Sequence, residues 1–346
     1  MPDYASKFSN KLFTQPQLLA CLILKTYCRL DYRSFEDWLQ TAAPIRRRLK
    51  LKRVPDYSTL CWFFHHKLDE AKLQALLEQT VRLWPCQQPG DAWVALDSTG
   101  FESKHVSRYY RWRSGQGGQH GWPKWAIALW VQPQLICAQH AREGPKRDFD
   151  ELPPLAQAAA QRVPMCGLLA DAGYDSEANH RFCREQLGVC SIIPARRSPW
   201  SEAQQPYRLQ MQQSFPRRLY GQRWKVETAI SVVKRKLGDA LSVRRCGAQP
   251  LQLFLMGVTY NLHRLQILFV FVCPTPYLII LWIGFQQSNG FYTLRLFADS
   301  TCTITESNEG NNQVTRTYAV SAGPPDLVIQ SLTLNKSIYG AGETAT

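Results

Sequence analysis

Apolar residues recur with a helical period in the first part of the chain, from about residue 16 to residue 84. In QPQLLACLILKTY they lie three and four positions apart, which predicts an amphipathic helix. Further helices are predicted in SFEDWLQTA and in PDYSTLCWFFHHKL, which begins with the Pro, Asp and Ser residues typical of a helix start. The pattern therefore predicts a small bundle of short helices.

From about residue 92 to residue 265, short apolar runs alternate with amphipathic segments. The runs WVALD, KWAIALWV, QLICAQHA, GLLAD and CSIIP are typical of strands, and the second and third are joined at Gln132 and Pro133 as in a hairpin. Helical patterns occur in ELPPLAQAAAQRV, SEANHRFCREQL and YGQRWKVETAISVVKRK. This order of elements predicts an α/β fold, in which helices pack on the faces of a mixed sheet.

The pattern changes again after residue 266. Residues 267–285 read ILFVFVCPTPYLIILWIGF and approach the length of about 20 apolar residues that crosses a bilayer. Pro274 and Pro276 interrupt this run, so we expect no membrane span, with a span at 267–285 as the alternative. The rest is rich in Thr, Ser, Asn and Gly and contains the strand patterns FYTLRLF and TRTYAV. We therefore expect a helical domain at residues 1–88, a mixed α/β domain at 89–266 and a separate tail at 267–346.

Charge narrows the class of partner. The formal net charge is +14, and 12% of the residues are aromatic. Residues 268–346 hold three cationic side chains against five acidic ones, so the positive excess belongs to the residues before them. Such an excess favours a polyanionic partner, most often a nucleic acid, because each neutralised phosphate releases condensed counterions. A basic protein without such a partner is the alternative.

Cysteine usage and the N-terminus indicate the compartment. The chain has 11 cysteines but no C-x-x-C pair and no regular spacing, which supports neither a zinc knuckle nor a disulfide framework. The N-terminal segment MPDYASKFSNKLF has no apolar run behind a basic start and does not resemble a secretory signal. We therefore expect reduced thiols and a cytoplasmic protein.

Two aspartates stand at the ends of predicted strands, Asp97 in WVALD and Asp171 in GLLAD. Either one alone is typical of a turn or a helix cap. The carboxyl ends of adjacent strands line one crevice, however, and two carboxylates facing one point repel unless a cation lies between them. Oxygen ligands of this kind suit Mg²⁺ or Mn²⁺. We leave out Asp148 and Asp150, which are expected to start a helix, and Asp175, which is expected to cap the next one.

A polar stripe runs along the predicted helix YGQRWKVETAISVVKRK. At about 100° per residue, one face holds Tyr220, Arg223, Glu227 and Lys234, and the face beside it holds Val226, Ile230, Val233 and Leu237. An ordinary i, i+4 ion pair between Arg223 and Glu227 is one explanation, but it leaves Tyr220 and Lys234 unexplained. The other is that Glu227 joins the two strand-end aspartates as a metal ligand.

Two basic segments are candidates for contact with phosphates. The first, RRRLKLKR, lies between two predicted helices, and a solvated basic loop is its alternative. Its cations are Arg46, Arg47, Arg48, Lys50, Lys52 and Arg53. The second interleaves cations with aromatic residues before a glycine-rich turn and suits stacking on unpaired bases, or else it is a hairpin extension with half-buried aromatics. Its candidate residues are Arg108, Arg111, Trp112 and Arg113.

These motifs together resemble the bacterial insertion-sequence transposases with a DDE catalytic domain. The resemblance covers roughly residues 10–265 and rests on Asp97 in LDSTG, on Asp171 in LLADAGYDS, and on the spacing of Tyr220, Arg223, Glu227 and Lys234. It implies an RNase H-like fold for the mixed sheet and a DNA-binding role for the N-terminal helices. Beyond it, the tail resembles parts of CARDB-type adhesion repeats, which are extracellular β-sandwich modules, and we interpret the tail as read-through into a disrupted gene.

The resemblance also implies a mechanism. Asp97, Asp171 and Glu227 would hold two divalent ions, Mg²⁺ or Mn²⁺, for cleavage and strand transfer at the ends of the insertion sequence itself. Tyr220, Arg223 and Lys234 would contact the DNA backbone. The partners would be double-stranded DNA with terminal inverted repeats, target DNA and further copies of the chain. The alternatives are a nuclease of the same fold without strand transfer and a membrane-anchored adhesion protein defined by the tail.

Overall fold

The computed structural model describes residues 2–4, 11–84, 92–103, 122–144, 148–196, 205–272, 290–297 and 313–320. The chain divides into two compact units, Met1–Leu268 and Phe269–Thr346. Of the predicted DNA contacts, Arg108, Arg111, Trp112 and Arg113 lie outside the described residues.

The three helices predicted in the N-terminal part are present as α1 (Gln15–Cys28), α2 (Tyr32–Thr41) and α4 (Tyr57–Lys67). Two further helices, α3 (Ala43–Arg48) and α5 (Glu70–Arg82), were not predicted individually. Capping explains where they start: Thr14 forms a capping box with Gln17, and the aspartates at 31, 56 and 69 accept backbone N–H bonds at the starts of α2, α4 and α5. The basic run is only partly a connection, because Arg46, Arg47 and Arg48 form the last turn of α3. That short helix starts at Ala43 and Pro44, where proline is favourable.

A five-stranded sheet has the order β4-β3-β1-β5-β6. Its strands are β1 (Ala92–Gly100), β3 (Pro123–Trp130), β4 (Leu135–Glu143), β5 (Met165–Leu169) and β6 (Cys190–Ile192). β1 pairs antiparallel with β3 and parallel with β5, which confirms the predicted mixed sheet. The turn between β3 and β4 contains Gln132 and Pro133, as predicted. A separate short pair joins β2 (Glu102–Ser103) to β7 (Ala240–Leu241).

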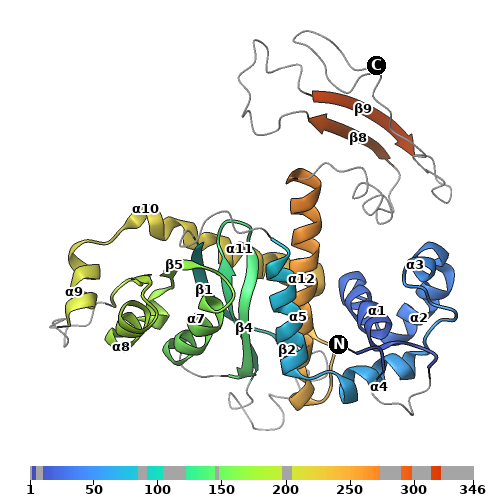
Figure 1. Ribbon diagram of the computed structural model, residues 1–346, viewed down its shortest axis with the longest axis horizontal. Coiled ribbons are helices and arrows are strands. Elements are labelled where there is room, and N and C mark those ends of the chain that lie inside the picture. Colours follow the sequence, from blue (N-terminus) through green and yellow to red (C-terminus); the bar gives the residue numbers. More distant parts are fainter. Residues whose placement is uncertain are drawn as a thin grey trace, which may run out of the picture. The chain divides into compact units, whose positions relative to one another are not determined.

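Helices and short turns follow the strands. They are η1 (Asp148–Glu151), α7 (Leu152–Ala160), η2 (Ala172–Tyr174), α8 (Glu177–Arg181), η3 (Phe182–Gln186), α9 (Pro206–Gln213), α10 (Arg217–Tyr220), η4 (Gly221–Arg223), α11 (Trp224–Leu237), η5 (Cys246–Ala248) and α12 (Gln249–Val272). The sequence pattern did not predict α12. This helix lies beside α5, where the Asn261 side chain donates to Thr80 Oγ1 at 2.9 Å (Figure 1).

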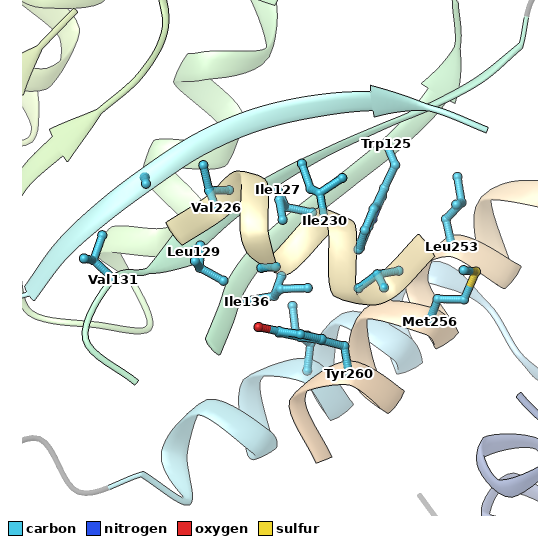
Figure 2. Close-up of a cluster of buried hydrophobic side chains, with 14 of the residues drawn as sticks. Trp125, Ile127, Leu129, Val131, Ile136, Val226, Ile230, Leu253, Met256 and Tyr260 are labelled. Atoms are coloured by element: carbon cyan, nitrogen blue, oxygen red, sulfur yellow. The ribbon is translucent and has the colours of Figure 1, made fainter. Parts of the chain in front are cut away.

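The sheet is buried on both faces, and alternation along β3 divides its side chains between two cores. Trp125, Ile127 and Leu129 belong to one core, which α11 and α12 cover with residues such as Val226 and Met256 (Figure 2). The residues between them on β3 point to the opposite face, where α7 contributes to the second core. Helix α11 is thereby fixed against the sheet by its apolar stripe.

The second unit contains two described strands. β8 (Gly290–Phe297) and β9 (Gln313–Val320) pair antiparallel, which confirms the strands predicted in FYTLRLF and TRTYAV. Across the described parts of the chain, no helix is long and apolar enough to cross a membrane. Residues 273–285 of the apolar run are not among them.

Candidate active site

Asp97 lies on β1 rather than at its end. The strand continues to Gly100, and Asp97 is paired with Ile127 of β3, so the predicted strand end at Asp97 is wrong. The Asp97 carboxylate is only 20% exposed, and its Oδ1 accepts the Ser98 N–H at 2.8 Å. Burial raises the pKa of Asp97 to about 6; the charges of Asp171 and Glu227 act in the same direction, whereas the Ser98 N–H and Arg223 oppose it.

Asp171 lies two residues after the end of β5, close to the predicted strand end. Its Oδ1 accepts the Gly173 N–H at 2.8 Å and caps the short turn η2. Gly173 is required here, because a Cβ at this position would lie 2.8 Å from Asp171 Oδ1. Asp171 is therefore a cap residue, and its charge also reaches Asp97 from the neighbouring strand.

Arg223 joins the helix to the strand. Its guanidinium forms an ion pair with Glu227 on the first turn of α11, and its Nη1 lies 3.9 Å from Asp97 Oδ2. Burial lowers the pKa of Arg223, but Tyr220, Glu227 and the two aspartates outweigh this effect, so the pKa is raised overall. The predicted i, i+4 pair is present, and the same arginine also reaches a carboxylate from a distant part of the sequence.

The polar stripe does not lie on one continuous α-helix. Tyr220 ends α10, Arg223 ends the 3-10 turn η4, and only Glu227 and Lys234 lie on α11. Arg223 still lies 5.9 Å from the centre of the Tyr220 ring. Lys234 Nζ donates to the Gly100 carbonyl at 3.0 Å and lies 5.1 Å from the centre of the Phe101 ring, so it ties α11 to the end of β1.

A fourth acid, Asp148, lies beside this group, and the sequence interpretation left it out. It starts the turn η1 as expected, but its Oδ1 accepts the Ser98 hydroxyl at 2.7 Å and pairs with Lys124 Nζ. Burial raises the pKa of Asp148, but the Lys124 and Ser98 hydrogen bonds outweigh it and lower the pKa below its ordinary value. With Phe149, Gly173 and Arg196, Asp148 lines an open pocket of about 450 Å³. No spacing in the sequence linked Asp148 to Asp97.

Asp175 does not cap the helix that follows it. Ser176 is the N-cap of α8, and its hydroxyl accepts the Asn179 N–H at 3.1 Å. Asp175 is instead buried and accepts two bonds from the Arg208 guanidinium, at 3.0 and 2.8 Å. It therefore anchors α9 and stays outside the site.

The predicted phosphate contacts of the N-terminal helices lie on the surface around the end of α3. Arg47, Arg48, Lys50, Lys52 and Arg53 are exposed, whereas Arg46 is partly buried and donates to the Leu39 carbonyl at 2.7 Å. Their role in binding DNA stays a prediction. The same applies to Tyr220, Arg223 and Lys234.

Comparison with known proteins identifies the family. The model of the transposase DDE domain matches residues 88–262, about half of the chain and the whole segment that carries the three carboxylates. The chain belongs to this family. An uncharacterised protein of Aquifex aeolicus (strain VF5) is 22% identical over 269 residues, which are 75% of this chain and 80% of that protein.

Solved structures of an integrase and of transposases are similar to this chain at low sequence identity. The catalytic core domain of BIV integrase is 12% identical, with 48% of this chain and 81% of that chain covered and a TM-score of 0.26. The Drosophila P element transposase strand transfer complex is 9% identical, with 77% and 62% covered and a TM-score of 0.33. The Mos1 mariner paired end complex with Mn is 12% identical, with 76% and 80% covered and a TM-score of 0.27. These scores are low, and the fold is defined by the chain's own mixed sheet and its flanking helices.

DDE transposases act on DNA and generally use divalent metal ions. Among the residues described, no three His, Cys, Asp or Glu side chains are close enough together to hold a metal ion. The charges nevertheless fit a cation, because Asp97 is buried near two other carboxylates and the Arg223 guanidinium pairs with both Asp97 and Glu227. Arg223 thus stands in for a cation between these two acids.

Proposed function

We propose that this chain is a DNA transposase that cleaves and joins DNA at the ends of its own insertion sequence. The observation that carries the proposal is the convergence of acids from three separate elements, β1, the end of β5, and α11. Asp97 is affected by the charges of both Asp171 and Glu227, and Arg223 bridges Asp97 to Glu227. Carboxylates from three elements whose charges act on one another, with a guanidinium between two of them, suit phosphoryl transfer assisted by divalent ions.

Asp97, Asp171 and Glu227 would hold two Mg²⁺ or Mn²⁺ ions. The ions, when bound, supply activation of the attacking oxygen and neutralise charge on the transferred phosphate. The chain's own groups orient the substrate. Arg223, once released from the carboxylates, is positioned to bind a DNA phosphate through its guanidinium, and Tyr220 lies beside it. No protein nucleophile is required.

The DNA would extend from this site over the basic surface of the first unit. We assign it two contact regions. One is formed by Arg46, Arg47, Arg48, Lys50, Lys52 and Arg53, and the other by Arg108, Arg111, Trp112 and Arg113. The substrates would be double-stranded DNA with terminal inverted repeats and a target DNA, bound by a homo-oligomer in the cytoplasm.

A strand-transfer assay tests the proposal. The full chain is incubated with Mg²⁺, a labelled duplex bearing the inverted repeats that flank the gene, and a supercoiled target. We expect cleavage at the repeat ends and joined products, both lost when EDTA removes the ions. Cleavage without joined products would favour the nuclease alternative. The absence of both cleaved and joined products would overturn the proposal.

A further inference from the structure

The part of β1 that carries Asp97 has a strand neighbour on one side only. β1 pairs with β3 from Val94 to Gly100, but it pairs with β5 only from Ala92 to Ala95. Asp97 and Ser98 therefore lie beyond the last pair with β5. A side chain from outside the sheet is needed to fix this segment on that edge, since no ladder bonds from β5 reach it.

The turn η1 provides that support, and it is itself held from two directions. At its end, the buried Glu151 forms ion pairs with His140 and Arg142 of β4. In the middle of η1, the Phe149 carbonyl accepts a hydrogen bond from Asn179 Nδ2 at 3.0 Å. The same Nδ2 donates to the Tyr174 carbonyl of η2 at 2.8 Å. The turn is thereby tied both to the sheet and to the segment that Asp171 caps.

Asp148, at the start of η1, connects to β1 through one residue. Its Oδ1 accepts the Ser98 hydroxyl at 2.7 Å, and the Ser98 N–H donates to Asp97 Oδ1 at 2.8 Å. Neighbouring residues on a strand point to opposite faces, so Asp148 acts on Asp97 across the strand rather than by contact. Lys124, whose side chain is only 10% exposed, fixes the Asp148 carboxylate from β3.

We propose that Asp148 is a positioning residue: by holding the Ser98 hydroxyl, it keeps the Ser98 N–H on Asp97 Oδ1 and so sets the direction of the other oxygen, Oδ2, which pairs with Arg223 in this structure. This inference rests on the proposed function, because the oxygen is presented to a divalent ion and to the DNA phosphate. Partners of this kind orient metal ligands, and their loss commonly weakens metal affinity by about 10- to 100-fold.

The test compares Mn²⁺ affinity, measured by electron paramagnetic resonance on the full chain, across a small set of variants. Asp148→Ala and Ser98→Ala should each weaken the affinity by about 10-fold or more, and the double variant should be no weaker than the single ones. Asp148→Asn keeps an acceptor for the Ser98 hydroxyl and should retain most of the affinity. Asp150→Asn, an exposed acid in the same turn, is the matched control and should bind Mn²⁺ as the wild type does.

Three outcomes would overturn the inference. They are an unchanged affinity in Asp148→Ala, additive losses in the double variant, and an Asp148→Asn variant as weak as Asp148→Ala, which would make Asp148 a ligand. Thermal unfolding of each variant shows whether it is folded. If the wild type binds Mn²⁺ but yields no joined DNA, only the proposed function is excluded. The Mn²⁺ affinities of the variants still decide the role of Asp148. A wild type that binds no Mn²⁺ would remove both.

Discussion

At the scale of single residues, the acids of the site differ in how strongly their surroundings constrain them. Glu227 is less constrained than Asp97, because 53% of its side chain is exposed and it pairs only with Arg223 among the described residues. The Asp97 side chain is only 20% exposed and is subject to two like charges. A change at Glu227 should therefore affect chemistry more than folding, and a change at Asp97 should affect both.

Replacement of Glu227 by Gln should abolish cleavage while the protein stays folded and bound to DNA. The substitution removes a metal-ligand charge without changing the shape of the side chain, so we expect cleavage to fall by about 10³-fold or more. Cleavage rates are measured on gels, DNA binding is measured with end DNA, and folding is measured by thermal unfolding. Glu70→Gln, at an exposed start of α5, is the control, and retained cleavage in Glu227→Gln would exclude Glu227 from the triad.

Replacement of Asp97 by Asn should stabilise the metal-free protein at pH 7.5. The pKa of Asp97 is raised from 3.8 to about 6 in the folded chain, so the stability that its protonated form provides is complete below 3.8 and lost as the pH rises through about 6. At pH 7.5 the wild type has lost all of this stability, because Asp97 is charged. The Asp97→Asn variant loses none of it, because its side chain is neutral at every pH. We expect a gain on the order of 2 kcal/mol, or several degrees.

The measurement is thermal unfolding in EDTA over a range of pH. The difference between Asp97→Asn and the wild type should shrink as the pH falls and vanish near pH 4. Asp150→Asn serves as a control for the general loss of an acid. An Asn variant less stable than the wild type at pH 7.5 would show that the Arg223 and Ser98 contacts outweigh the burial of the charge.

The sequence predicts residues of the candidate site where a residue lies near the end of an element or stands at a fixed spacing from another. The position of Asp171 close to the end of a strand and that of Arg223 four residues before Glu227 are visible in the sequence. The link between Arg223 and Asp97 was not, because it depends on how α11 packs against β1. Asp148 was missed for the same reason, because its partners are distant in the sequence: Ser98 lies on β1 and Lys124 on β3.

At the scale of elements, the periodic segments were predicted and α12 was not. Consecutive residues of this helix are buried on different sides: Leu253 and Met256 belong to the core under α11, and Phe254 and Leu255 belong to the core of the N-terminal helices. A helix that is buried on all sides, as α12 is from residue 253 to residue 261, has no clear 3.6-residue stripe, so its pattern does not separate it from other apolar runs. The predicted single helix from Tyr220 failed differently, because the η4 turn interrupts it before Trp224.

The close packing of α12 on the sheet gives an element-scale prediction. A Cβ on Gly257 would lie 2.1 Å from Gln139 Oε1, and Gln139 is held by bonds to Trp125 and to the Phe254 carbonyl, each at 3.2 Å. Gly257→Ala should therefore destabilise the fold by about 1–3 kcal/mol, as overpacking does. Chemical unfolding measures this. Gly247→Ala is the control, since a Cβ there meets nothing within 4 Å, and equal stabilities of the two variants would contradict this packing.

At the scale of the whole molecule, the N-terminal helices and the sheet form one compact unit. Leu77 of α5 is part of the core under α11, and Phe254 of α12 is part of the core of the N-terminal helices. The composition did predict where the strongly basic part ends and the tail begins. It did not show that α12 contributes to both cores, because that requires contacts across most of the chain. A boundary at residue 88 stays a prediction.

This arrangement predicts where the chain can be shortened. All candidate site residues and all three buried cores, the two on the faces of the sheet and the one of the N-terminal helices, lie within Met1–Leu268, and α12 ends at Val272. A chain ending at Val272 should therefore keep the unfolding temperature, DNA binding and strand transfer of the full chain, and proteolysis of the full chain should trim it to about that point.

A chain ending at Gly247 lacks α12 and should fail to fold, because the two cores that Leu253 and Phe254 fill would open to water. Loss of strand transfer in the chain ending at Val272, or a protease-resistant tail, would assign the tail a role and contradict its interpretation as read-through.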